Sequence, residues 1–348
     1  MMRMSRKKSN NQLYWEKRFL QIKAREIRST EEFEKALQPQ LGVLEKELQS
    51  EIEKFTVRYA NNQGVDKDEA RKLLKDVKSK NWRMTLEQFA ARAKAGEFPE
   101  LLDAEYLRSR VARLQELESQ LKILTASFSD NQTDQMEQQL VHQYIDTYTR
   151  TSYASQSMMQ NFAVIYAVFD EQLLRAVVSR PWEGSNFSQH VWGTYRNTMV
   201  DEVMDVIVRG TLMGYGPAKV TSMFRAKFGD IKRYDVHRLI VTEMAHVAEE
   251  ATFKSYEDNE IDWYEYSATL ESHTCDVCAA LDGQHFKVID KVEGKNAPVM
   301  HPHCRCTTMP WLEGLPPVLL RGYRDPDSGR WKTGPNMSFK EWKKKYVV

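Results

Sequence analysis

All four cysteines of this 348-residue chain lie between positions 275 and 306. Two stand in Cys275-Asp-Val-Cys278, and the other two follow in His301-Pro-His-Cys-Arg-Cys306. Thiolates separated by two residues can face one tetrahedral ion across a tight turn, and alternate residues of an extended segment also point the same way. The pattern therefore predicts a structural zinc site. A site of this type contributes about 10 to 16 kcal/mol in small modules, enough to decide whether residues 261–312 fold.

Six side chains of this pattern can bind zinc, two more than a closed tetrahedral site needs. The three preferred ligands are Cys275, Cys278 and Cys304. The fourth is either Cys306 or His301, and His303 is the least preferred. Paired disulfides, redox thiols or a catalytic metal are the alternatives. Clustered cysteines differ from the dispersed pairs of a secreted disulfide framework, so an intracellular, reducing compartment is expected.

Enzymatic interpretations have less support. A zinc deaminase needs a proline before the first cysteine and a His-x-Glu upstream, and neither is present. A zinc-braced nuclease of the His-Asn-His kind is the competing class, because three histidines near the cysteines could act as general base: His273, His285 and His303. Glu243 and His246 have the Glu-x-x-His spacing of di-iron proteins, but that motif must occur twice, so a solvated pair is expected.

The first part of the chain has helical periodicity. Apolar residues recur every three or four positions from Ser29, which has capping-box spacing to Glu32, and predict a helix that closes at 61–64. Pro39 should kink or interrupt this helix, because proline removes a backbone donor and crowds the preceding turn.

More helices are expected beyond this one. They should follow Asp66 and Thr85 and continue with apolar spacing from Leu107 to Leu124. Thr133–Val178 contains no Gly or Pro and predicts one long helix or two stacked helices. Its aromatic residues are expected to pack in the core: Tyr144, Tyr148 and Phe162.

A second helical group should run from Ser188 to Asp258 after a boundary at 181–184. Breaks are expected at Gly214-Tyr-Gly-Pro217 and at Gly229. The first of these lacks the Gly-Lys-Ser/Thr of a phosphate loop, so it predicts a helix break and not a nucleotide site.

The pattern changes from helix to strand at Ile261. Trp263–Thr269 favours a strand, Asp282-Gly283 is typical of a hairpin turn, and His285–Ile289 supplies a return strand. The tail from Leu315 is rich in Pro, Gly and basic residues and is expected to be an extended arm ending in a small helix.

The predicted fold is mainly α: a long helical N-terminal body, a second helical group, and a small zinc-bound α+β C-terminal module with an extended tail. We divide it into a variable helical domain with a basic N-terminus (1–180), a helical middle domain (181–260), a zinc-binding β module (261–312) and a basic C-terminal arm (313–348).

Charge is unevenly distributed along the chain. Residues 1–28 carry a net charge of +7 and residues 321–348 a net charge of +5, which leaves an acidic middle. Such ends are either solvated tails or surfaces for nucleic acid or an acidic protein. The longest apolar run, Phe162–Phe169, has eight residues, so neither a signal peptide nor a membrane span is expected.

Three motifs carry a family resemblance: Thr274-Cys-Asp-Val-Cys278, Leu281-Asp-Gly-Gln-His-Phe286 and Pro298-Val-Met-His-Pro-His-Cys-Arg-Cys306. In this order they resemble the C-terminal domain of the Mu F-like head morphogenesis proteins of tailed bacteriophages, also called minor head or minor capsid proteins. The similarity covers about half the chain and extends to further segments: Val241-Thr-Glu243, 182–216 and 342–346.

The chain departs from the family at two places. The family commonly has Arg-Thr-Glu where this chain has Val241-Thr-Glu243, and Asp-x-Arg-Thr-Cys where it has Glu271-Ser-His-Thr-Cys275. Both changes remove an arginine, and neither touches a candidate metal ligand.

The resemblance implies a noncatalytic protein that is present in a few copies inside the procapsid and is bound to the portal protein and other head proteins. It would assist head assembly, DNA packaging or ejection, in the capsid interior of the virion and in the host cytoplasm during assembly. Phage DNA is a further candidate partner, whose phosphate contacts would weaken steeply with salt. No membrane and no small-molecule substrate are expected. The alternative function is a zinc-braced nuclease acting on DNA.

Overall fold

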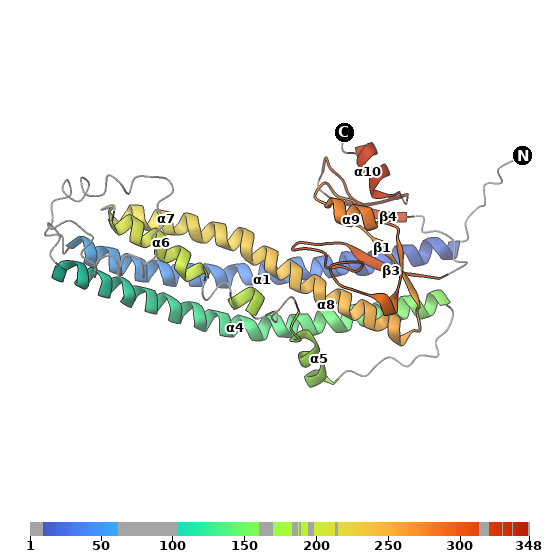
Figure 1. Ribbon diagram of the computed structural model, residues 1–348, viewed down its shortest axis with the longest axis horizontal. Coiled ribbons are helices and arrows are strands. Elements are labelled where there is room, and N and C mark those ends of the chain that lie inside the picture. The colour runs from blue at the N-terminus through green and yellow to red at the C-terminus, as the bar shows by residue number, and fades with distance from the viewer. Residues whose placement is uncertain are drawn as a thin grey trace, which may run out of the picture. The chain divides into compact units, whose positions relative to one another are not determined.

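The protein is mainly helical, as the sequence predicts (Figure 1). The computed structural model describes these residues: 10–61, 104–159, 170–182, 187, 189–193, 198–212, 215–312, 320–328, 330–335 and 337–346. Helices predicted after Asp66 and Thr85, and the aromatic Phe162, lie outside the described residues.

The chain forms two compact units, each assembled from separate stretches. Unit 1 contains residues 1–34, 137–180 and 238–348, and unit 2 contains 35–136 and 181–237. Each unit combines distant parts of the chain, so the units do not correspond to the four consecutive domains predicted from the sequence. Those four domains remain a prediction.

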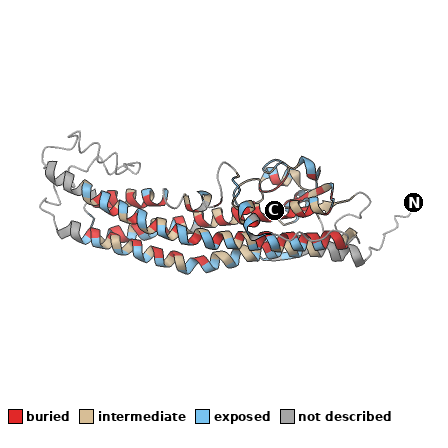
Figure 2. Ribbon diagram, turned by 90° about the horizontal axis from the view of Figure 1, so that it is seen from below, coloured by how far each residue is buried: buried red, intermediate tan, exposed pale blue. Residues whose placement is uncertain are grey.

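Two long helices supply much of the fold, α1 (Asn10–Asn61) and α4 (Ala104–Met159). Buried residues follow each helix as stripes (Figure 2), and those of α1 recur at the predicted spacing: Leu37, Leu41, Leu44, Leu48 and Ile52. The predicted helix start at Ser29 is wrong, because its hydroxyl accepts a hydrogen bond from Gln139 Nε2 at 2.9 Å inside a continuous helix. Pro39 also lies within α1 and does not interrupt it.

The second half of α4 confirms the predicted packing role of its aromatic residues. Tyr144 and Tyr148 are buried, and the Tyr148 hydroxyl donates to Asp258 Oδ2 at 2.7 Å. α4 ends at Met159, and α5 (Glu171–Val178) covers the last part of the stretch predicted as one or two helices.

In unit 2, α6 (Val200–Leu212) packs closely against α7 (Pro217–Asp230). A Cβ atom added at Gly210 would lie 3.0 Å from Val220 Cγ2, so the two helices approach at this glycine. Pro217 begins α7 directly after Gly216, which confirms the predicted break. Proline suits the first helical position because the backbone N–H that it lacks would have no partner within the helix there.

The break predicted at Gly229 is wrong. Gly229 lies within α7, and the backbone remains helical through a π-helical turn (Ile231–Val236) into α8 (His237–Asp258). A helix tolerates a single glycine at a cost of about 1 kcal/mol relative to alanine. The buried Phe224 and Phe228, whose rings lie 5.7 Å apart, stabilise this part of α7.

A three-stranded antiparallel sheet in unit 1 has the order β2-β1-β3. Its strands are β1 (Trp263–Ser267), β2 (His285–Lys287) and β3 (Thr307–Trp311). Tyr264 lies opposite Phe286 and Pro310, and its ring packs 4.9 Å from that of Phe253 on α8. The strand predicted from Trp263 is confirmed, and the return strand is shorter than predicted because Val288–Asp290 form a 3-10 turn.

The return strand pairs antiparallel with β1, as predicted, but the connection is not a tight hairpin, since α9 (Asp276–Leu281) lies between β1 and β2. The Asp282-Gly283 turn follows this helix instead. Gly283 has φ of 75°, a conformation that glycine adopts without strain, and its N–H donates to the Tyr266 carbonyl at 2.8 Å.

The C-terminal tail is not an extended arm. It forms an antiparallel hairpin of β4 (Leu320–Arg324) and β5 (Trp331–Pro335), followed by α10 (Phe339–Tyr346), which confirms the small helix. Trp342 is fully buried together with Leu270 and Phe339, so burial of aromatic surface holds the tail on the module.

Candidate metal centre

Helix α9 positions the first two cysteines. Cys275 is its N-cap residue, and its Sγ accepts a hydrogen bond from the Cys278 N–H at 3.4 Å. One turn of helix thus places the second thiol close to the first, as the two-residue spacing predicts. The helix start also supplies N–H groups that favour a thiolate.

The second part of the site comes from the loop that enters β3. A turn in which the Cys304 N–H donates to the His301 carbonyl at 3.0 Å brings this loop back over α9. His301 Nε2 lies 3.5 Å from Cys278 Sγ. The loop and α9, far apart in sequence, therefore meet at one sulfur.

Two groups of candidate ligands share that sulfur. Their ligand atoms lie within 4.8 Å of one another in each group, and the groups are Cys275, Cys278 and His301, and Cys278, Cys304 and Cys306. The structure thus brings together the five predicted metal ligands, with Cys278 at the centre, and these side chains could hold a metal ion.

Three of the four cysteines are shielded from solvent. Cys278, Cys304 and Cys306 are 1%, 2% and 4% exposed, and they pack in one apolar cluster with Tyr266, Ala268 and Val299. The four cysteines are not paired as disulfides. Buried cysteine ligands of this kind are typical of structural metal sites.

The sulfur atoms share protons. Hydrogen bonds from Cys278 and Cys306 lower the pKa of the Cys304 thiol, and hydrogen bonds with Cys304 and Cys306 raise the pKa of Cys278. At Cys275 burial raises the pKa, but the Cys278 backbone and side chain outweigh it, so the pKa is lowered. A divalent cation can replace these shared protons, because metal binding requires deprotonated thiols.

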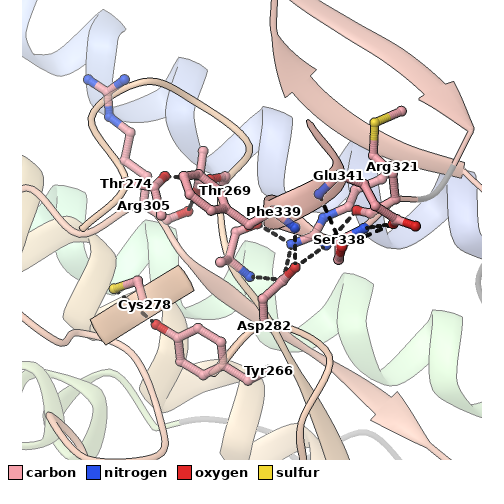
Figure 3. Close-up of polar contacts among 12 residues, drawn as sticks. Tyr266, Thr269, Thr274, Cys278, Asp282, Arg305, Arg321, Ser338, Phe339 and Glu341 are labelled. Atoms are coloured by element: carbon pink, nitrogen blue, oxygen red, sulfur yellow. Dashed lines mark hydrogen bonds and ion pairs between the residues drawn. The ribbon is translucent and has the colours of Figure 1, made fainter. Parts of the chain in front are cut away.

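Neighbouring polar groups support the sulfurs. The Tyr266 hydroxyl donates to Cys278 Sγ at 3.4 Å, as Figure 3 shows. The Thr269 hydroxyl donates to the Arg305 carbonyl at 2.6 Å and so holds the backbone between Cys304 and Cys306. Such contacts orient metal ligands and tune their basicity.

Helix α8 holds the ligand loop through Thr242 and His246. Thr242 Oγ1 accepts from the His303 N–H at 3.1 Å, at a residue with φ of 65°. His246 Nδ1 lies 2.8 Å from Glu293 Oε1, which also accepts from the Val299 N–H at 3.3 Å. These contacts explain a structural role for the threonine of the Val241-Thr-Glu243 motif.

The sequence interpretation of Glu243 and His246 as a solvated pair is wrong. Glu243 is 2% exposed, and His246 pairs with Glu293 across 47 residues. The sequence shows that Glu243 and His246 are three residues apart, but it does not show that Glu293 is the partner of His246.

Replacing Thr242 with valine should loosen the ligand loop. Valine keeps the shape but removes the acceptor of the His303 N–H, which costs about 1 kcal/mol. In protein loaded with Zn²⁺, we expect faster loss of the metal to a competing chelator, followed with a colorimetric zinc indicator. Thr149→Val, at an exposed position of α4, is the matched control. Equal rates of metal loss in both variants would contradict this role.

The three histidines considered for a nuclease lie outside both ligand groups. His285 is on β2, where its Nε2 lies 3.2 Å from Glu265 Oε2 and its ring stacks on Trp311 at 4.5 Å. His273 and His303 are exposed. Within the described part of the chain, the structure does not bring these histidines together with the clustered sulfur ligands.

Comparison with known families tests the resemblance found in the sequence. Residues 197–309 match the family described as phage Mu protein F like protein. This segment, about a third of the chain, is similar to that family. Over these residues the match confirms the resemblance predicted from the sequence. No curated protein and no solved structure matched the chain. Within the described residues, no helix is long and apolar enough to cross a membrane.

A buried charge cluster that joins α1 to α8 was not predicted from the sequence. Lys23 Nζ lies 3.1 Å from Glu26 Oε2 and 3.3 Å from Glu249 Oε1 on α8. Burial, which the attraction of Lys23 offsets only in part, raises the pKa of Glu249 to about 7. The Lys23 ammonium thus pairs with the carboxylates of both Glu26 and Glu249, and Glu249 takes up a proton more readily than an ordinary glutamate.

The free energy of unfolding should therefore fall as pH rises. The folded-state pKa of Glu249, about 7, lies above its ordinary value of 4.5, so between these values the folded chain keeps a proton that the unfolded chain releases. We expect Glu249→Gln to remove this decline. Between pH 4 and pH 8 the free energy of unfolding of the variant should rise by about 3 kcal/mol relative to that of wild type. Urea unfolding at each pH measures it.

The exposed Glu116→Gln provides the control for this experiment and should follow the wild-type pH dependence. Parallel pH profiles for wild type and Glu249→Gln would mean that Glu249 is ionised throughout and fully neutralised by Lys23.

Proposed function

We propose that this chain is a noncatalytic minor head protein that assists phage head morphogenesis. The observation that carries the proposal is the Mu F-like match over 197–309, because this segment contains the five clustered ligands as well as Thr242 and His246, which hold their loop. The part of the chain that resembles a head protein is therefore also the part built around a candidate metal site.

We further propose that the cluster binds a structural zinc ion. Thiolate and imidazole donors suit Zn²⁺, whereas Mg²⁺ and Ca²⁺ prefer oxygen ligands. Four of the five side chains would complete a tetrahedral site. When bound, the ion would join α9 to the loop that enters β3 and would stabilise the module without taking part in chemistry.

The proposed partners are the portal protein and other head proteins inside the procapsid, with the host cytoplasm as the place of assembly. The basic ends support contact with an acidic protein surface or with phage DNA during packaging or ejection. On α10 the cations are exposed at Lys340, Lys343, Lys344 and Lys345 while Trp342 is buried. Cationic contacts of this kind should weaken with salt.

Complementation in the phage tests this function. A phage that lacks the gene should yield few DNA-filled heads by electron microscopy, and wild-type protein should restore them. Cys278→Ser should not restore them, whereas Val277→Ser, at a position 59% exposed on the same helix, should. Normal heads without the protein, and its absence from purified particles by mass spectrometry, would refute a role in the head.

A nuclease assay tests the competing enzyme class. We expect plasmid DNA to stay intact when it is incubated with the purified protein and Mg²⁺ or Mn²⁺. Cleavage that disappears in His303→Ala would replace our proposal with a zinc-braced nuclease.

A further inference from the structure

Unit 1 carries an open groove between its two long helices. The groove runs along residues 18–31 of α1 and 142–154 of α4 and has a volume of about 1150 Å³. Fourteen helical residues extend about 20 Å, so the groove can accommodate roughly four turns of a third helix.

Apolar side chains line part of this groove and remain open to solvent. Ile145 is 40% exposed and Tyr153 is 43% exposed, while the partly buried Ile22 and Ile27 contribute from α1. On each helix the lining residues recur every three or four positions, which makes a stripe that matches the side of another helix. Exposed apolar surface of this kind marks interaction sites.

The rim of the groove is basic. Its charged residues include four arginines and two carboxylates: Arg18, Arg25, Arg28, Arg150, Glu31 and Asp146. Asp146 is already shared, because it accepts from Arg25 Nε at 2.6 Å and from Arg150 Nε at 2.9 Å. The Arg18 guanidinium lies 5.7 Å from the centre of the Tyr153 ring, where apolar and cationic surfaces meet.

We propose that this groove binds an amphipathic helix whose apolar stripe is flanked by carboxylates. The apolar lining fits the helix-in-groove mode of recognition, and arginines bind carboxylates in a planar, bidentate geometry. That the helix belongs to another head protein rests on the function proposed above.

Other occupants fit the groove less well. A nucleic-acid backbone would satisfy the arginines but would leave Ile145 and Tyr153 uncovered. A second copy of the same groove would bring two basic rims together, and like charges repel. An acidic amphipathic helix matches both the apolar lining and the charge of the rim.

The test uses the full chain and a synthetic probe. The probe is a fluorescent peptide of about 18 residues, with leucines at helical spacing and glutamates on both sides of the leucine stripe. Two control peptides carry lysines in place of the glutamates, or the same composition in scrambled order. Fluorescence anisotropy should show saturable binding of the glutamate peptide, with at least tenfold weaker binding of both controls.

Two variants locate the binding site. Ile145→Ser combined with Tyr153→Ser, and separately Arg28→Glu, should each weaken binding at least tenfold, and Arg28→Glu should improve binding of the lysine peptide. Both variants change exposed residues, and circular dichroism verifies that they fold. The control is Ile123→Ser, at a position 68% exposed on α4 but outside the groove, and it should bind like wild type.

Several results would overturn the proposal. These are equal binding of the scrambled or lysine peptide, unchanged affinity in the groove variants, and displacement of the peptide by duplex DNA. Dimers in sedimentation that the serine variant dissolves would assign the groove to a second copy. If the serine variant loses the peptide yet restores filled heads, the groove stands as a binding site and only its role in the head fails.

Discussion

Removal of the proposed zinc ion should unfold residues 261–346 while unit 2 stays folded. Three of the clustered thiols are buried between α9 and the ligand loop, so without the ion only apolar packing and weak hydrogen bonds of the sulfur atoms would join the two segments. Structural zinc contributes roughly 10 to 16 kcal/mol, more than the whole stability of many domains. The tail should unfold too, because Trp342 packs on Leu270 of the module.

Elemental analysis and limited proteolysis measure this effect. Freshly purified protein should contain about one zinc per chain, and a strong chelator should make residues 261–346 sensitive to protease. Fragments that contain α6 and α7 should persist, because their core of Ile207, Phe224 and Phe228 includes no candidate ligand.

Single substitutions rank the ligands. Cys278→Ser should abolish metal binding because Cys278 belongs to both ligand groups, whereas His301→Ala and Cys306→Ser should differ and so identify the fourth ligand. Val277→Ser serves as the control. Metal-free protein with four titratable thiols, prepared without chelator, would exclude the zinc site and favour a redox or disulfide role for the same cysteines.

The parts of the site that the sequence predicted are those set by short spacing. Cys275 and Cys278 are close because one turn of helix separates them, and Cys304 and Cys306 because they alternate along an extended segment. Apolar periodicity likewise predicted the buried face of α1, and the aromatic residues Tyr144 and Tyr148 of α4 pack in the core as expected for an uninterrupted helix.

Interactions between distant residues could not be predicted in this way. Lys23 and Glu249 are 226 positions apart, and no local pattern marks either one as a buried ion. Ser29 has capping-box spacing to Glu32 and precedes an apolar periodic stretch, yet α1 is helical on both sides of it and its hydroxyl contacts Gln139. Asp282 was interpreted as a hairpin residue from its neighbour Gly283, although its carboxylate has a different role.

That carboxylate joins the turn after α9 to the C-terminal tail, residues 320–346. Asp282 accepts from the N–H groups of Ala268 at 3.0 Å and Phe339 at 2.9 Å, and from Arg321 Nη1 at 2.9 Å (Figure 3). Arg321 also donates to the carbonyls of Ala268 and Met337. With side chains only 3% and 8% exposed, Asp282 and Arg321 form a buried ion pair between the α9 turn, β4 and the start of α10.

Asp282→Ala should therefore destabilise unit 1 by about 3 to 5 kcal/mol, because it leaves the Arg321 charge buried without its partner. Two backbone N–H groups would also lose their acceptor. Urea unfolding measures the loss, and proteolysis should show release of residues 320–346 before the rest of unit 1.

Two comparisons separate the ion pair from general damage. Glu118→Gln breaks an exposed pair with Lys122, at 2.5 Å, and should cost less than about 1 kcal/mol. Asp282→Ala combined with Arg321→Met should be less harmful than the sum of the single changes, since it removes the unpaired charge, while the N–H groups of Ala268 and Phe339 would remain unsatisfied. A loss below 1 kcal/mol in Asp282→Ala would mean that the aromatic cluster around Trp342 holds the tail without this carboxylate.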